Sequence, residues 1–79
     1  MKESYKTNYN PELFSQRLRI ALSKRTLTQA ELSRRTGISE ASLSRYVNGT
    51  RAPRILHLVN LASTLDVSTD YLLGKLDLK

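Results

Sequence analysis

A run of start and stop signals for two short helices lies between residues 28 and 49. The signals are, in chain order, Thr28, Glu31, Gly37, Ser39, Asn48 and Gly49. A threonine three residues before a glutamate forms a capping box at a helix N-terminus, a serine caps a second helix, and a left-handed glycine ends a helix. The run therefore predicts two helices joined by a sharp turn, within about Thr28 to Val47, with the second helix beginning near Ser39.

A further helix is predicted before this pair. Asn10 can cap it, Pro11 suits its first position, and Glu12 complements the positive end of the helix dipole. Its apolar residues recur with helical spacing, and we expect it to end near Lys24 or Arg25.

Two more helices are predicted after the pair. Pro53 opens the first, whose apolar stripe is expected to comprise Ile55, Leu58, Val59, Leu61, Ala62 and Leu65, and Asp66 ends it. Ser68 caps a short last helix, which Gly74 stops. No strand pattern is found, so we expect an all-α domain over residues 11–74, with an N-terminal arm over 1–10 and a tail over 75–79.

Size and composition exclude several classes of protein. A chain of 79 residues without cysteine must rely on a small helical core, because it can form neither a disulfide nor a thiolate-bound zinc site. His57 is the only histidine and has no partner at metal-binding spacing, and no nucleophile motif or glycine-rich phosphate loop is present. Without a signal peptide or membrane span, we expect a cytoplasmic protein that is not an enzyme, with no metal, cofactor or small-molecule ligand.

The positive charge is concentrated in the middle of the chain. Residues 17–54 contain nine Lys and Arg and two Glu, for a net charge of +7, whereas the rest of the chain carries −1. This distribution is typical of a protein that binds a polyanion on one face, although a solvated charged surface would look the same.

The segment from Gln29 to Gly49 resembles the helix-turn-helix of the lambda-repressor-like, Cro-type proteins, also called the XRE family. Leu32, Ile38, Leu43 and Tyr46 stand at its apolar contact positions, and Ser33 is small where its helices approach. The resemblance covers about Leu13 to Gly74, through RLRIALSKR, LTQAELSRRTGIS, LSRYVNGTRAPR and LVNLASTLDVSTDYLLG. It implies a compact five-helix DNA-binding domain whose second and third helices form the helix-turn-helix.

The family's docking mode places the start of the third helix in the major groove. Its candidate base contacts are Ser39, Glu40, Ala41, Ser44 and Arg45. Arg45 is the strongest, because a guanidinium can bond bidentately to guanine, though a phosphate contact is its alternative. Glu40 could accept a hydrogen bond from cytosine or merely complement the helix dipole, and Ser39 is a cap as well as a possible contact.

Contacts to the DNA backbone are expected from helix N-termini, amides and short polar side chains. The candidates are Gln29, Ser42, Asn48, Gly49, Thr50, Arg51 and Arg54. Arg54 matches a family position near the operator centre, whereas Arg34 and Arg35 are expected to be solvated.

The resemblance implies a transcriptional regulator, expected to be a repressor that binds a pseudo-palindromic operator on double-stranded DNA as a homodimer. The candidate dimer residues are Val67, Tyr71, Leu72 and Leu76, of which some could instead belong to the core. An alternative is an antitoxin-like protein-interaction module that binds DNA secondarily. A third possibility is the DNA-binding part of a longer repressor.

Three departures from the family are visible. Thr26 and Asp66 stand where the family often has glycine, so either the turns differ or the backbone is strained. Leu22 and Val47 match positions where some members pair Arg with Glu, and we expect an apolar contact there instead. Ile20 lies off the apolar stripe and is expected to be either covered by the arm or a second subunit, or simply exposed.

Overall fold

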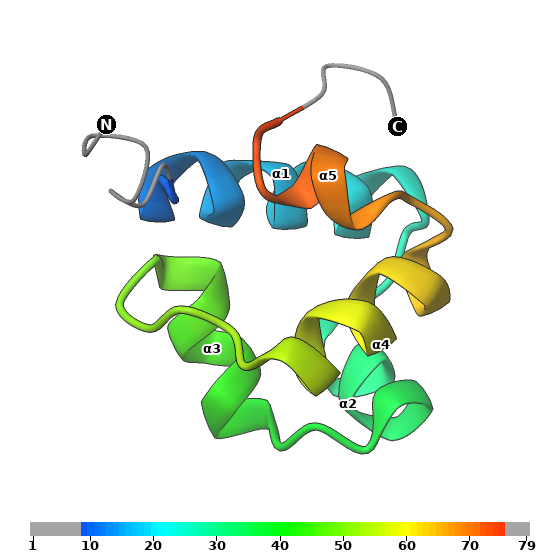
Figure 1. Cartoon of the computed structure of the whole chain (residues 1–79). Coiled ribbons are helices and arrows are strands. Elements are labelled where there is room, and N and C mark those ends of the chain that lie inside the picture. The colour runs from blue at the N-terminus through cyan, green and yellow to red at the C-terminus, as the bar shows by residue number, and fades with distance from the viewer. Residues whose placement is uncertain (1–8, 76–79) are drawn as a thin grey trace, which may run out of the picture.

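The computed structural model describes residues 9–75, which form five α-helices and no strand (Figure 1). The helices are α1 (Pro11–Lys24), α2 (Gln29–Thr36), α3 (Glu40–Asn48), α4 (Ile55–Leu65) and α5 (Thr69–Leu72). The predicted all-α fold and helix order are confirmed. Within residues 9–75, none of the helices combines the length and apolar character that a membrane span requires.

The ends of the first three helices follow the predicted local signals. The Asn10 side chain accepts a hydrogen bond from the Leu13 amide at 3.1 Å, which caps α1. At α2, the Thr28 amide donates to Glu31 Oε1 at 2.8 Å and the Glu31 amide donates to Thr28 Oγ1 at 3.1 Å, completing the capping box. Because these bonds satisfy amides that the helix leaves unpaired, the helix starts are set by the sequence next to them.

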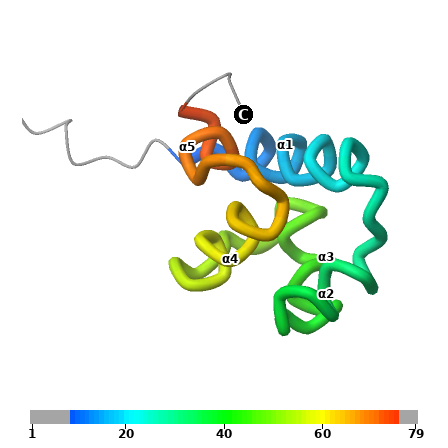
Figure 2. The backbone as a smooth tube through the Cα atoms, turned by 90° about the vertical axis from the view of Figure 1, so that its right-hand side faces the viewer, coloured from blue at the N-terminus to red at the C-terminus, as the bar shows by residue number. Residues whose placement is uncertain are grey.

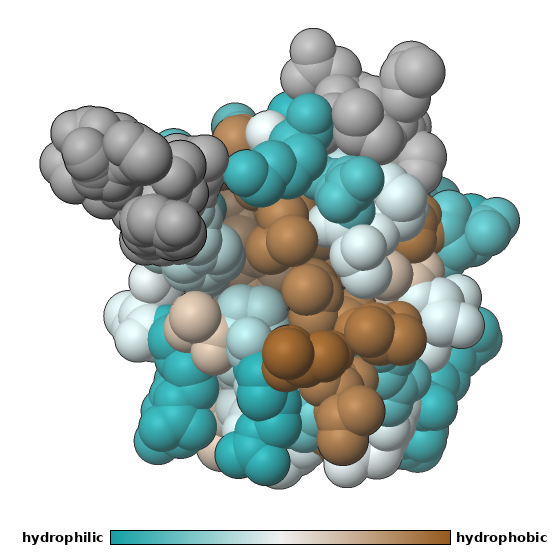
Figure 3. All heavy atoms as spheres, viewed as in Figure 1, coloured by the Kyte–Doolittle hydropathy of each residue, from teal (hydrophilic) through white to brown (hydrophobic). Residues whose placement is uncertain are grey.

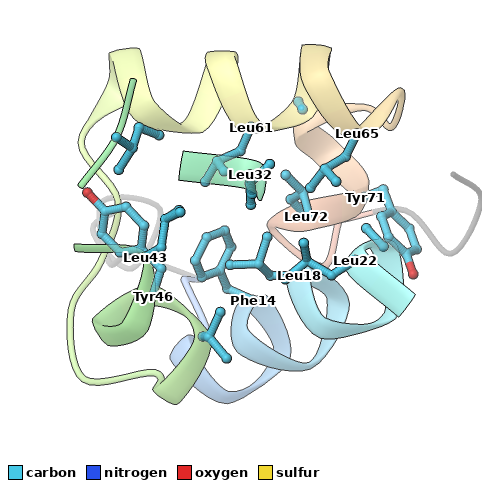
Figure 4. Packing of buried hydrophobic residues seen from close by; sticks show 14 residues of the cluster. Phe14, Leu18, Leu22, Leu32, Leu43, Tyr46, Leu61, Leu65, Tyr71 and Leu72 are labelled. Carbon is cyan, nitrogen blue, oxygen red and sulfur yellow. The ribbon is translucent and has the colours of Figure 1, made fainter. Parts of the chain in front are cut away.

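The helices pack in two layers around one core. α1 and α5 lie together above α2, α3 and α4, as two views at right angles show (Figures 1 and 2). Every helix contributes to the core (Figure 4), whose fully buried large side chains are Phe14, Leu18, Leu32, Leu43, Tyr46, Leu61, Leu65 and Leu72. Ile38 is also buried. The sequence prediction that the apolar contact residues of the helix-turn-helix lie in the core is therefore confirmed.

The predicted apolar stripe of α4 is wrong at Ile55 and Val59, although Leu58 packs against the core. Leu61, Ala62 and Leu65 are buried, but the Ile55 side chain is 76% exposed and that of Val59 is 51% exposed. The helix also begins at Ile55 rather than at Pro53, with Arg54 in extended conformation before it. Helical spacing shows which residues share a face, but it does not show where along the helix other elements stop covering that face.

Two corners of the chain are strained, as the missing glycines suggested. Thr26 has φ 52° and Asp66 has φ 56°, both in the left-handed region that glycine tolerates best. Arg25 joins the two corners, since it donates a hydrogen bond from Nε to the Leu65 carbonyl and forms an ion pair with Asp66, each at 3.1 Å. The ion pair is exposed, so its contribution to stability is small.

Candidate nucleic-acid interface

α3 buries one face and presents the other to solvent. Leu43, Tyr46 and Val47 face the core. Four of the predicted base-contact residues are exposed, namely Ser39, Glu40, Ala41 and Arg45, while Ser44 is half-buried. Within residues 9–75, the Arg45 guanidinium forms no hydrogen bond or ion pair, so it is available to a ligand.

The turn between α2 and α3 is fixed by side-chain hydrogen bonds. Ser33 Oγ donates to the Ile38 carbonyl at 2.6 Å, and Thr36 Oγ1 accepts from the Ile38 amide at 3.1 Å. Gly37 adopts φ 77°, as the predicted stop signal requires. From α4, the Asn60 amide group donates to the Thr36 carbonyl at 2.8 Å. These bonds hold the exposed face of α3 at a defined angle to α2.

The start of α3 is capped by a residue that is also a candidate base contact. Ser39 Oγ accepts a hydrogen bond from the Ser42 amide at 3.1 Å, so the predicted cap role of Ser39 is confirmed. Glu40 lies in the first turn, where its carboxylate complements the helix dipole. The N-terminus of α3 is therefore rigid and open to solvent.

The predicted backbone-contact residues lie mainly around the far end of α3. Gly49 ends the helix with φ 75°, and the Thr50 amide donates to the Arg45 carbonyl at 3.0 Å. Asn48, Thr50, Arg51 and Arg54 are exposed, whereas Gln29, Ser42 and Gly49 are half-buried. Gln29 is the first residue of α2. The predicted backbone-contact residues therefore come from the start of one helix and from the polar loop after another.

A buried polar contact beneath α3 was not predicted. Arg19 donates a hydrogen bond to the Val47 carbonyl at 2.8 Å and another to Ser15 Oγ, and the Ser15 hydroxyl donates to the same carbonyl. These two α1 residues thus satisfy a carbonyl that the C-terminus of α3 leaves unpaired. The one feature of the sequence that could have indicated this contact is Ser15, a polar residue next to the apolar positions of α1. Its side chain is only 3% exposed. Leu22 and Val47 are themselves buried in the core, as their apolar character predicted.

His57 connects α3 to α4 in the structure. Its Nδ1 lies 2.6 Å from the hydroxyl of Tyr46, whose ring is buried against Phe14 with centroids 6.4 Å apart. Burial, and secondarily the nearby Arg54 charge, lower the pKa of His57. Among residues 9–75, no three His, Asp or Glu side chains gather in a way that could hold a metal ion.

Two of the four candidate dimer residues are buried in the monomer. Tyr71 is 4% exposed and Leu72 has no exposed surface, because both pack in the core of the monomer. The Tyr71 ring is also covered by the Arg17 guanidinium, 4.6 Å from the ring centroid. Val67 is half-buried against the core, and Leu76 lies outside the described residues. Tyr71 and Leu72 therefore fit the core alternative that the sequence left open, and the dimer contact itself stays a prediction.

Comparison with known proteins assigns the family. A helix-turn-helix family model matches residues 17–72. The uncharacterized HTH-type transcriptional regulator YqaE of Bacillus subtilis is 36% identical over 61 residues, covering 77% of this chain and 53% of YqaE. The HTH-type transcriptional regulator ImmR of the same species is 41% identical over 59 residues, covering 75% of this chain and 46% of ImmR. The chain thus spans about half the length of these curated relatives.

A solved structure agrees with the sequence comparison. The P22 c2 repressor protein, determined in complex with a synthetic operator, superposes with a TM-score of 0.75 at 30% identity. The match covers 80% of this chain and 96% of the repressor chain. Because the family model matches residues 17–72 and the repressor has a similar fold, the chain belongs to the helix-turn-helix family.

Proposed function

We propose that the protein is a transcriptional regulator that binds double-stranded DNA with α3 in the major groove. The observation that carries this proposal is the exposed face of α3, which presents Ala41 and Arg45 next to the cap residue Ser39. Hydrogen bonds hold the ends of this helix and the turn before it. A rigid helix presenting short polar side chains and an arginine matches the donor and acceptor pattern of base edges.

The base contacts come from the exposed start of α3 and from Arg45. Glu40 accepts from a cytosine amino group or complements the helix dipole, and Ala41 contacts a thymine methyl. Arg45 bonds to guanine, which discriminates against other bases by about 1 to 3 kcal/mol. Half-buried Ser44 contributes less than its exposed neighbours.

Contacts to phosphates set the register of α3 on the duplex. They come from Gln29 at the start of α2, Ser42, and the loop from Asn48 through Arg51 to Arg54. The net charge of +7 over residues 17–54 favours such contacts and makes the affinity fall with salt.

The regulator is a repressor that binds a pseudo-palindromic operator as a homodimer and acts in the cytoplasm. It has no catalytic role and needs no metal, cofactor or small-molecule ligand for DNA binding. The repressor assignment is supported by the solved P22 c2 repressor, whose complex holds a synthetic operator. Two recognition helices then lie one helical turn apart, ~34 to 36 Å, on one face of the duplex.

Selection from random duplex DNA at about 150 mM salt tests this proposal. We expect a two-fold symmetric motif bound ~10³-fold or more above random DNA, with half-sites about ten base pairs apart. Recovery of no motif, with only weak and steeply salt-dependent binding, would overturn the proposal and leave charge as the sole basis for association.

A further inference from the structure

His57 is the only histidine of a chain that contains no cysteine. Histidine changes its charge at about pH 6.5, whereas carboxyl groups titrate near pH 4 and lysine and arginine above pH 10. The terminal amino group titrates at about pH 7.7 to 8.0. Between about pH 5.5 and about pH 7, a change in the charge of this protein is therefore centred on one side chain.

His57 lies at the junction between α3 and α4. Its Nδ1 is 2.6 Å from the hydroxyl of Tyr46, and the centroids of the two rings are 5.8 Å apart. Tyr46 is buried and directly follows Arg45, the proposed base contact. Arg54, a proposed phosphate contact, stands three residues before His57 and acts on it electrostatically. His57 is therefore joined to one proposed DNA contact through Tyr46 and lies close to another.

The contact with Tyr46 can be kept in both charge states of His57. A tyrosine hydroxyl can donate a hydrogen bond and can also accept one. It can donate to a neutral Nδ1, and it can accept from Nδ1 once the ring is protonated. The added proton comes from the solvent and binds the ring nitrogen that lacks one, so the ring gains one positive charge. Protonation therefore changes the charge at the junction without removing its hydrogen bond.

The surroundings of His57 favour its neutral form in the free protein. Burial, followed by the charge of Arg54, lowers the pKa of His57. α4 itself contains no charged residue, and Figure 3 shows apolar atoms gathered over it on the face drawn in Figure 1. The other helices near α4 carry Glu31, Arg34 and Arg35 on α2, Glu40 and Arg45 on α3, and Asp70 on α5. Within residues 9–75, none of these carboxylates forms an ion pair with His57.

A DNA duplex beside Arg54 would reverse this balance of charge. A phosphate bound to Arg54 neutralises the charge that now acts against protonation of His57. The duplex also carries one negative charge for every ~1.7 Å of its axis, and this charge acts over about 10 Å at 0.1 M salt. Both effects favour the positively charged ring, because a nearby negative charge stabilises it.

We propose that His57 takes up a proton when the protein binds its operator, so that operator affinity increases as the pH falls from about 7 to about 5.5. This inference rests on the proposed function, because it requires a duplex beside Arg54. It adds to that function a sensitivity to pH that resides in one residue at the junction of α3 and α4.

The same residue should have the opposite effect on folding. Because the pKa of His57 is lowered in the folded protein, the unfolded chain binds the proton more readily. The contribution of His57 to stability is therefore present above the unfolded-state pKa and decreases as the pH falls through it. Acid should weaken the fold slightly while it strengthens binding to the operator, and a purely structural role of His57 would not produce this pair of signs.

The test measures operator affinity by fluorescence anisotropy at constant salt for wild type and His57→Gln. Glutamine stays neutral and retains groups that can form a hydrogen bond with Tyr46. We expect the affinity of wild type to increase about threefold or more from about pH 7 to about pH 5.5, because one unit of pKa corresponds to a factor of ten. That of His57→Gln should change by less than about 1.5-fold over this range. Ser63→Gln, a neutral change at an exposed position of the same helix, should behave like wild type.

Calorimetry counts the proton directly. Titration of each protein with operator duplex at about pH 6, in buffers that differ in their enthalpy of ionisation, gives the number of protons bound on association. Wild type should take up a fraction of one proton, and His57→Gln should take up almost none. Urea unfolding without DNA checks that the variants are folded, and the unfolding free energy of wild type relative to His57→Gln should decrease toward the lower pH.

The results that overturn this inference differ from those that overturn the proposed function. Specific operator binding by wild type whose affinity stays constant or falls toward about pH 5.5 would overturn the inference alone. The same pH dependence and proton uptake in His57→Gln as in wild type would also overturn it, because the proton would then bind elsewhere. Failure of wild type to bind any DNA specifically at either pH would overturn the proposed function, and the inference with it.

Discussion

The pair α2 and α3 differs from α4 in how its ends are specified. Both helices of the pair begin at a hydrogen-bonding cap, Thr28 or Ser39, and both end at a left-handed glycine, Gly37 or Gly49. α4 follows Arg54, whose side chain makes no cap hydrogen bond, and precedes Asp66, which adopts the left-handed conformation at a steric cost. The paired helices are thus fixed by local chemistry, and α4 depends on burial.

This difference suits the role that we propose for α3. A helix that reads DNA must keep its angle when one face is solvated, so hydrogen-bonded caps and a fixed turn serve it. The second half of α4 is buried, whereas its first half is anchored only by Leu58 and by the contact between His57 and Tyr46, so Ile55 and Leu56 stay exposed. Three predictions test this contrast between the two regions, and they are given in order of decreasing effect on stability.

The largest effect is expected within α4 itself. Leu61→Ala should lower the free energy of unfolding by about 2 to 5 kcal/mol, because Leu61 is fully buried and its truncation leaves a cavity. Leu56→Ala on the same helix should change it by less than about 0.5 kcal/mol. Urea unfolding at low protein concentration measures both. Equal losses would show that the two halves of α4 are equally packed, contrary to the structure.

The helix starts should respond unequally to alanine. Ser39→Ala should cost about 1 kcal/mol of unfolding free energy, since it removes the hydrogen bond to the Ser42 amide. Arg54→Ala, at the corresponding position of α4, should cost less than about 0.5 kcal/mol because no side-chain cap is lost. Thermal and urea unfolding without DNA measure the pair. A larger loss of unfolding free energy for Arg54→Ala than for Ser39→Ala would contradict this difference between the two helix starts.

The smallest effect is a pH dependence of the α2 cap. Hydrogen bonds from the backbone and side chain of Thr28, with smaller contributions from Arg34 and Arg35, lower the pKa of Glu31. Its stabilising contribution is present above the unfolded-state pKa and is lost as pH falls through the lower folded-state pKa. The free energy of unfolding of wild type relative to Glu31→Gln should therefore decrease as the pH falls from about 5 to about 3. Urea unfolding of both proteins over this pH range measures the difference. An advantage that stays constant over this range would mean that the ionised carboxylate does not stabilise the cap.

The sequence was informative where structure depends on neighbouring residues. Hydrogen-bonding caps and the glycines that follow them located α2 and α3, and the family resemblance indicated that Glu40, Ala41 and Arg45 lie on the exposed side of α3. The family resemblance also drew attention to Thr26 and Asp66, which stand where glycine is frequent and adopt a left-handed backbone. Each of these features is decided within a few residues of chain.

Features that join distant segments were missed. The Ser15 hydroxyl meets the carbonyl of Val47, 32 residues away, and His57 meets the hydroxyl of Tyr46 on another helix. The exposure of Ile55 likewise depends on where neighbouring helices end. Apolar spacing reports which residues share a face, and only the packed molecule decides which part of that face is covered.

The most direct measurement of the central claim, that α3 reads DNA sequence, compares three alanine variants on the selected operator and on random duplex. Arg45→Ala should reduce the preference for operator roughly 5- to 150-fold, as expected for loss of a base contact worth about 1 to 3 kcal/mol. Asn48→Ala should weaken binding to both duplexes alike. Arg34→Ala, which removes the same charge from α2, should retain the preference. If Arg45→Ala weakens both duplexes equally and keeps the operator preference of wild type, Arg45 does not read a base and this account of α3 is contradicted.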